Sequence, residues 1–254
     1  MPRLVPFRLV AACALALILS LSFAAAAPAK TGGTPAMLRV VAKGGKQLAQ
    51  KALRTHTLSA PTSRKATCLG KGTGGSGKGV KLKGATALGL LVQAARSTPA
   101  LRPLSITDHF LSEFGLGLCG VGGYNAGGAF SWYLKVNHEN PNLGGELVKL
   151  KPGDEVLWAL AKYPYPNELS LVAPFSAHPG VPFQVTVFSY DDKGKKKPAA
   201  GATVTGALVP TDAAGHTMVT LTEATELVAR HGKDIPSNVA TVVMCDPSGA
   251  CPIP

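Results

Sequence analysis

The stretch Phe130-Ser-Trp-Tyr-Leu-Lys-Val-Asn137 decides the fold class of the first half of the chain. Large apolar side chains occupy every second position, and this period of two predicts a β-strand with one face in a hydrophobic core. The stretch Leu150-Lys-Pro-Gly-Asp-Glu-Val-Leu-Trp158 follows after a turn and leads into a second predicted strand at residues 155–162. The two strands together predict a sheet.

One helix is predicted upstream, at residues 84–96. Its apolar side chains recur at spacings of three and four, Thr86 can cap its first turn, and Pro99 lies just beyond its end. Shorter strands are expected at residues 37–42 and 54–58. Residues 104–114, which allow at most one further strand, precede a Gly-rich turn at residues 115–124. These elements predict an α+β domain in which one helix packs on a mixed sheet.

The prolines of Tyr163-Pro-Tyr-Pro-Asn167 predict a stiff linker. Beyond it, apolar segments recur about every ten residues between Gly, Pro and Asp turns, which is typical of an all-β sandwich of the immunoglobulin type. The expected strands are residues 169–173, 183–190, 202–205, 216–221, 226–230 and 239–244. The 29 Gly and 20 Pro of the 254 residues exclude a long helical bundle.

The first 27 residues are expected to be a secretory signal peptide. Arg3 and Arg8 precede an apolar run at residues 9–23, and small residues follow for cleavage. An uncleaved anchor and a lipidated Cys13 are the alternatives. No later stretch reaches the roughly 18 apolar residues of a membrane span, so the mature protein is expected to have none. With its signal peptide removed, the protein is expected to be secreted. Any association with the cell wall is expected to be non-covalent.

Four cysteines remain after cleavage, and an even number in an exported chain favours disulfides. Cys245 and Cys251 flank a short Pro-Ser-Gly turn, so we expect a local bridge there and a long-range bridge between Cys68 and Cys119. The two other pairings remain open at this stage. Since no Cys-x-x-Cys spacing occurs, no metal site is predicted.

Positive charge is concentrated near the N-terminus. The chain has a formal net charge of +12, and its first acidic residue is Asp108. Such a segment either keeps the protein soluble or attracts it to an anionic partner, for which a cell-wall polymer or surface is the expected choice. Nucleic acid is not expected, because residues 24–104 contain no aromatic side chain on which bases could stack.

The stretches quoted above, with Gly84-Ala-Thr-Ala-Leu88, resemble the domain family related to the C-terminal domain of transcobalamin and intrinsic factor. That resemblance implies a β-grasp-like fold and, from the vitamin-carrier members, contact with a corrinoid. Pro179-Gly-Val-Pro-Phe-Gln-Val-Thr-Val187 and Thr211-Asp-Ala-Ala-Gly-His216 are similar to bacterial immunoglobulin-like domains of exported proteins. The expected organisation is a signal peptide at 1–27, a flexible N-terminus at 28–36, a transcobalamin-C-terminal-like β-grasp domain at 37–163, a linker at 164–168, an immunoglobulin-like β-sandwich at 169–245 and a tail at 246–254.

No catalytic function or cofactor is predicted. The sequence lacks a G-x-S-x-G elbow and an H-E-x-x-H motif, and its six histidines are scattered. The best polar cluster, His138 beside Glu139, is expected in an exposed loop. The leading hypothesis is a secreted, cell-envelope-associated binding or adhesion protein. The alternative is a module that captures a small molecule or peptide along residues 115–128, with Tyr124, Tyr133 and Asn137 as its ligand-binding residues.

Overall fold

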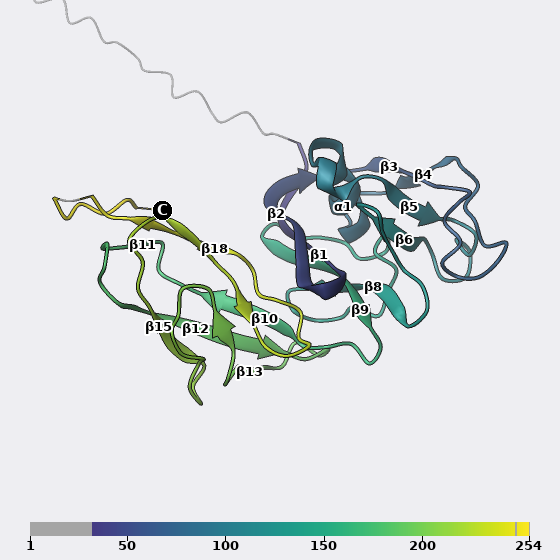
Figure 1. Cartoon of the computed structure of the whole chain (residues 1–254). Coiled ribbons are helices and arrows are strands. Elements are labelled where there is room, and N and C mark those ends of the chain that lie inside the picture. Colours follow the sequence, from purple (N-terminus) through teal and green to yellow (C-terminus); the bar gives the residue numbers. More distant parts are fainter. Residues whose placement is uncertain (1–31, 247, 254) are drawn as a thin grey trace, which may run out of the picture. The chain divides into compact units, whose positions relative to one another are not determined.

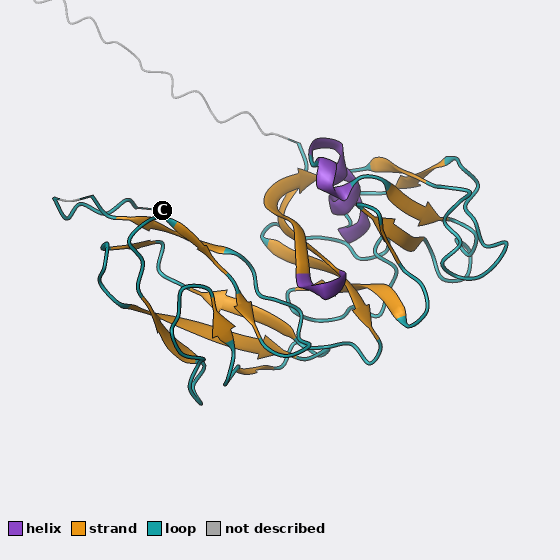
Figure 2. Cartoon of the chain, viewed as in Figure 1, coloured by secondary structure: helices purple, strands orange, loops and turns teal. Residues whose placement is uncertain are grey.

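The structure is a computed structural model that describes residues 32–246 and 248–253. In this part of the chain it contains one α-helix and many short strands in several sheets (Figure 1, Figure 2). The predicted signal peptide lies outside the described residues. The protein is therefore β-rich and of the α+β type, in agreement with the sequence. Among the described residues, no helix is long and apolar enough to cross a bilayer.

The central sheet of the first half is mixed, as predicted. Its strands lie in the order β2-β1-β9-β8, with β1 parallel to β9 and both other pairs antiparallel. Strand β8 therefore forms one edge of the sheet. The bounds are β1 Thr34–Ala42, β2 Lys46–Thr55, β8 Phe130–Val136 and β9 Asp154–Lys162.

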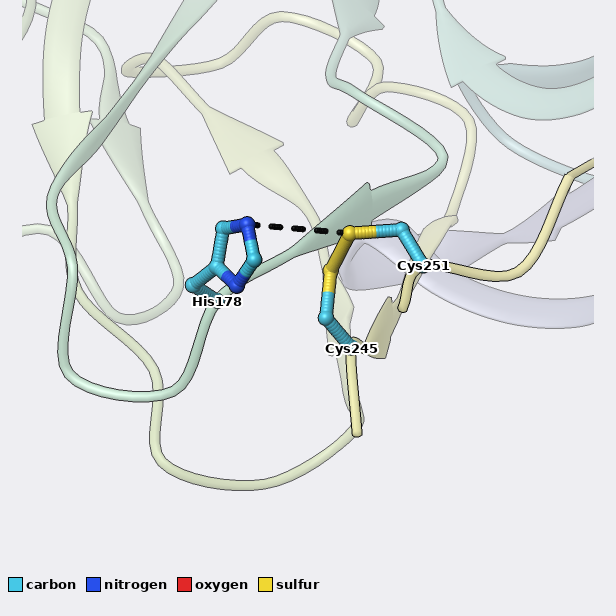
Figure 3. A group of neighbouring side chains, drawn as sticks. All are labelled: His178, Cys245 and Cys251. Carbon is cyan, nitrogen blue, oxygen red and sulfur yellow. Dashed lines mark hydrogen bonds between the residues drawn. A yellow bond between two sulfur atoms is a disulfide. The ribbon is translucent and has the colours of Figure 1, made fainter. Parts of the chain in front are cut away.

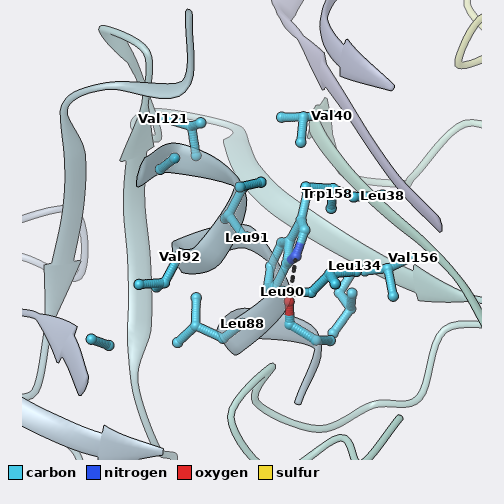
Figure 4. Close-up of a cluster of buried hydrophobic side chains, with 14 of the residues drawn as sticks. Leu38, Val40, Leu88, Leu90, Leu91, Val92, Val121, Leu134, Val156 and Trp158 are labelled. Atoms are coloured by element: carbon cyan, nitrogen blue, oxygen red, sulfur yellow. Dashed lines mark hydrogen bonds between the residues drawn. The ribbon is translucent and has the colours of Figure 1, made fainter. Parts of the chain in front are cut away.

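Helix α1 (Ala87–Ser97) confirms the predicted helix, and a 3-10 turn at Pro99–Leu101 follows it. The Thr86 hydroxyl caps α1 by accepting a hydrogen bond from the Gly89 N–H at 3.0 Å. Its apolar face packs on the sheet, where Leu91 and Trp158 lie in one buried cluster (Figure 4). The Trp158 indole N–H also donates to the Ala87 carbonyl at 3.4 Å. We call residues 34–162, which share this cluster, the N-terminal lobe.

The second strand begins earlier than the sequence predicted. We expected it at residues 54–58, but β2 starts at Lys46 and pairs with β1 along its whole length. A 3-10 turn at Lys43–Gly45 joins the two strands, and Gly44 has the positive φ that this tight reversal requires. Strand β2 contains many polar and small residues and is mostly half-buried. Its sequence therefore shows no clear alternation of apolar and polar side chains.

The Gly-rich segment at residues 115–124 is also not simply a turn, as the sequence had suggested. It contains strand β6, which forms a small sheet between β5 and β7. Disulfide Cys68–Cys119 attaches β6 to the loop that joins strands β3 and β4. The strands here are β3 Leu58–Pro61, β4 Gly79–Leu82, β5 Leu104–Thr107, β6 Gly117–Val121 and β7 Tyr124–Asn125.

The second half is a set of small sheets around its own hydrophobic cluster, which includes Leu169, Val187 and Leu227. We call residues 168–244 the C-terminal lobe. One sheet contains β10 Glu168–Val172, β12 Phe183–Tyr190, β13 Lys196–Pro198 and β15 His216–Val219; a second contains β11 Ser176–Ala177, β18 Ala240–Met244 and β16 Thr225–Leu227; β14 Thr203–Val204 pairs with β17 Ala229–Arg230. The segment 226–230, expected as one strand, is thus divided between β16 and β17.

Both faces of the central sheet are buried, although the sequence predicted only one. Trp132 and Leu134 face α1, while Tyr133 of the opposite face packs in a separate cluster with Leu157 and with Ile235 of the C-terminal lobe. The C-terminal lobe therefore covers the face that the alternation had placed in solvent. This second covered face brings charged side chains of the two lobes together.

Candidate ligand-binding cavity and buried charged cluster

The three predicted ligand-binding residues lie in three different environments. Tyr124 is half-buried in β7, and its carbonyl accepts a hydrogen bond from the Trp132 indole at 3.3 Å. Asn137 has a φ of 49° and closes the turn after β8, because its amide donates to Asp154 and accepts from the Glu155 N–H. The Tyr124 backbone and the Asn137 side chain therefore support the local fold.

Tyr133 is the only one of the three that lines a described cavity. Its ring stacks on Tyr165 with 4.0 Å between centroids, and its hydroxyl donates to Asp192 at 2.5 Å. Burial, the bond to Asp192 and the charge of that carboxylate raise the pKa of Tyr133. The neutral phenol thus links β8 to the C-terminal lobe.

A cavity of about 580 Å³ lies along β8, where the sequence had suggested ligand capture beside the Gly-rich segment. Its lining comes from several segments: Cys68 and Leu69, residues 116–118, residues 126–128, residues 130–134 of β8, and residues 140 and 142–145 of the following loop. Trp158 and Tyr165 complete the wall. Its lining contains no Asp, Glu, Lys or Arg, so the cavity suits an uncharged ligand.

A buried charged cluster, which no sequence pattern had predicted, joins the two lobes. Glu168 of β10 is 3% exposed and forms an ion pair with Arg39 of β1. Lys135 of β8 is 0% exposed, and its Nζ lies 3.6 Å from Glu168 Oε2 and donates to the Asp191 carbonyl at 2.8 Å. One carboxylate therefore faces two buried cations.

The charges of this cluster stabilise one another. Burial lowers the pKa of Arg39 and of Lys135, and the charge of Glu168 opposes that change. Burial alone would raise the pKa of Glu168, but contact with His138 and the charges of Arg39 and Lys135 outweigh it and hold the pKa below its usual range. Glu168 is therefore ionised at neutral pH, and both cations depend on it.

His138 lies in the loop after β8, where its neighbours Asn137 and Glu139 are exposed as predicted, but its own side chain is only 21% exposed. Its ring stacks on Tyr190 at 3.8 Å, and its Nδ1 lies 3.1 Å from Glu168 Oε2. Neither of these two atoms makes a hydrogen bond with the described residues. A cavity of about 310 Å³ beside them has a mixed lining of charged, polar and apolar side chains. Its charged and polar residues are Arg39, Gln50, His138, Glu155, Glu168, Ser170 and Asn238.

The two disulfides follow the pairing that the sequence favoured, Cys68–Cys119 and Cys245–Cys251. His178 Nε2 lies 3.7 Å from Cys251 Sγ (Figure 3). The three side chains are close enough to share a metal ion. Both sulfurs are bonded to each other, however, and a metal needs the thiolate form, so the group does not act as a ligand set in the oxidised protein.

Basic side chains at residues 43–102 remain without acidic partners. The described residues place no carboxylate within 4.0 Å of any of them. All but the half-buried Lys51 are exposed. They are Lys43, Lys46, Lys51, Arg54, Arg64, Lys65, Lys71, Lys78, Lys81, Lys83, Arg96 and Arg102.

Comparison with protein-family models, curated proteins and solved structures gives no match.

Proposed function

We propose that this chain is an exported, non-catalytic binding protein of the cell envelope, and that its basic N-terminal lobe contacts an anionic cell-wall polymer. The observation that carries the proposal is the set of exposed basic side chains at residues 43–102 that have no acidic partner among the described residues. Unpaired charges of one sign attract a polyanion without requiring a shaped pocket.

We further propose a β-grasp-like N-terminal domain, related to the C-terminal domain of transcobalamin and intrinsic factor, followed by an immunoglobulin-like domain. Support for the first comes from the hairpin of β1 and β2, the single helix, and the parallel pairing of β1 with β9. Support for the second comes from short, mostly antiparallel strands around a separate cluster.

Binding to isolated anionic cell wall is expected to weaken steeply with salt, because exposed charges are screened over about 8 to 10 Å at physiological ionic strength. A co-sedimentation assay of the mature protein at about 0.05 M and about 0.5 M salt measures this. Replacing Lys78, Lys81 and Lys83 together by Gln should reduce the low-salt binding. Equal retention at both salt concentrations would contradict the proposal.

The matched control removes the same number of exposed lysines from the C-terminal lobe. Lys193, Lys195 and Lys197 are exposed and lie outside the basic lobe. If their replacement by Gln reduces binding as much as the first triple variant does, net charge rather than the N-terminal lobe determines the attraction.

A second candidate function, capture of a small molecule that could be corrinoid-like, is favoured by the cavity along β8. Its volume of about 580 Å³ lies within the range of about 300 to 1,000 Å³ that is typical of ligand sites. Aromatic and apolar side chains line it together with the polar side chains of Ser131, Asn140 and Asn142, which could orient a ligand by hydrogen bonds.

Native mass spectrometry of the protein secreted by its own host tests export and ligand capture together. We expect a chain that begins between Ala25 and Lys30, with both disulfides intact. A bound small molecule would appear as a discrete added mass and would favour the second function. A secreted chain that still begins at Met1 would contradict the export proposal.

A further inference from the structure

The outer edge of β8 is open to a new strand. In the central sheet β8 is the last strand, and the structure pairs no described strand with its far side. An open edge exposes backbone N–H and C=O groups that can bond to another chain. The register between β8 and β9 identifies the residues of β8 that present these groups.

The inner side of β8 is identified by two bonds at its ends. The Tyr163 N–H donates to the Ala129 carbonyl at 3.3 Å, and the Asn137 N–H donates to the Glu155 carbonyl at 2.8 Å. In an antiparallel pair, opposed residues alternate between exchanging both hydrogen bonds and exchanging none. Odd-numbered residues of β8 therefore bond to β9, and even-numbered residues direct their backbone groups outward.

At both ends of the outer edge, loop residues already bond to the backbone groups of β8. Phe130 exchanges bonds of 2.9 and 3.1 Å with Gly127, and Val136 exchanges bonds of 2.8 and 3.1 Å with Glu139. Between them stand Trp132 and Leu134, whose outward backbone groups bond to no loop or side chain of the described residues. The edge thus presents two N–H and two C=O groups in a row.

These groups face the cavity described above, whose lining includes every residue from 130 to 134. Trp132 and Leu134 are 8% and 6% exposed, so unpaired backbone groups here are costly. Gly127 also lines the cavity, and a Cβ at this position would meet no atom within 4 Å, so its backbone leaves room for a second backbone to approach.

We propose that the free edge of β8 binds an extended, uncharged peptide segment of a partner polypeptide by strand addition. The inference rests on the ligand-capture function proposed for this cavity and names its ligand class. Main-chain hydrogen bonds to Trp132 and Leu134 supply the pairing, and alternate side chains of the peptide enter the cavity.

The lining determines the chemistry of this partner. Because the cavity contains no charged side chain, a charged peptide residue would lose its hydration without gaining an ion pair. Leu69 and Leu143 line the cavity although they are 51% and 58% exposed. Apolar peptide side chains would cover both leucines.

Hydrogen exchange of the oxidised mature protein, followed by NMR, tests the inference. The probe is a mixture of peptides with blocked termini and the length of β8, which is 7 residues. Each position holds Gly, Ala, Val, Leu, Ser or Thr at random. Before addition, the Trp132 and Leu134 amides should exchange faster than those of Tyr133 and Lys135. After addition, the first two should become protected. If neither amide gains protection at the solubility limit of the peptides, strand addition is wrong.

Backbone methylation of the probe separates strand addition from simple apolar burial. A peptide with N-methyl groups on alternate residues keeps one intact edge and should still bind. Methylation of every residue should weaken binding about tenfold or more, because it removes every backbone donor. Equal affinity of the two mixtures would contradict the proposal.

Protein variants locate the site. Leu143→Glu places a charge at the rim and should weaken peptide binding about tenfold or more, whereas Leu147→Glu is the matched control, because Leu147 is 54% exposed but does not line the cavity. If a small molecule occupies the cavity without protecting Trp132 and Leu134, ligand capture stands and strand addition fails. Salt-dependent wall binding is independent of either result.

Discussion

Glu168→Gln is expected to lower the free energy of unfolding by about 3 to 5 kcal/mol, since it removes one partner of a buried ion pair. The variant leaves the guanidinium of Arg39 and the ammonium of Lys135 buried without their carboxylate. Chemical denaturation of both proteins at neutral pH measures the difference. Glu226→Gln is the control, because Glu226 is exposed and its replacement should change stability by less than about 0.5 kcal/mol.

The same variant should also lose a pH dependence. Because the folded-state pKa of Glu168 is lowered, its stabilisation is complete above the usual pKa of a glutamate and is lost as the pH falls through the lowered value. The gap between the melting temperatures of the two proteins should therefore narrow as the solution is acidified from neutral. If the difference between the two melting temperatures stays constant as the pH falls to the lowered pKa of Glu168, the charge of Glu168 is not what stabilises the fold.

Loss of the Cys68–Cys119 disulfide is expected to destabilise the protein by about 4 kcal/mol in the chain-entropy model, because the two cysteines are 51 residues apart. Cys68→Ser together with Cys119→Ser makes the change without leaving a free thiol. The fluorescence of the two tryptophans, Trp132 and Trp158, reports unfolding of the N-terminal lobe, in which both are buried.

The matched control is the double Ser variant at Cys245 and Cys251. Their separation is 6 residues, so the same model gives a smaller loss of about 2 kcal/mol. Both tryptophans belong to the N-terminal lobe, which does not contain this bridge. Peptide mapping must first show the two native bridges. A map that joins Cys68 to Cys245 or Cys251, or equal losses from both double variants, would contradict the expected role of Cys68–Cys119.

Local patterns predicted the elements whose sequence and surroundings agree. Strand β8 and helix α1 carry clear periods of two and of three to four, and Thr86 caps α1 as expected. Strand β2 was placed too late in the sequence, because most of its residues are polar or small and only half-buried, so its alternation is weak. Strand β6 was hidden because Gly residues in the segment indicated a turn, although a small sheet accommodates them.

The candidate sites depend on contacts between segments far apart in the sequence. Arg39 and Glu168 are separated by 129 residues, and each alone is typical of a solvated surface residue. Lys135 stands at a position that the period of two assigned to solvent, yet the C-terminal lobe buries it. Ligand capture was predicted along residues 115–128, and the cavity along β8 includes part of that segment. Of the three predicted ligand-binding residues, however, only Tyr133 lines the cavity.

The shared burial of the central sheet makes the two halves of the chain poor candidates for separate expression. A fragment that ends in the proline-rich segment at 164–168 would return Tyr133 and Leu157 to water, together with Arg39 and Lys135. It would also lose Glu168 with the strand β10 that this residue begins. For protein engineering, the N-terminal half can be expressed alone or fused to another domain only after its outer face has been redesigned with polar side chains.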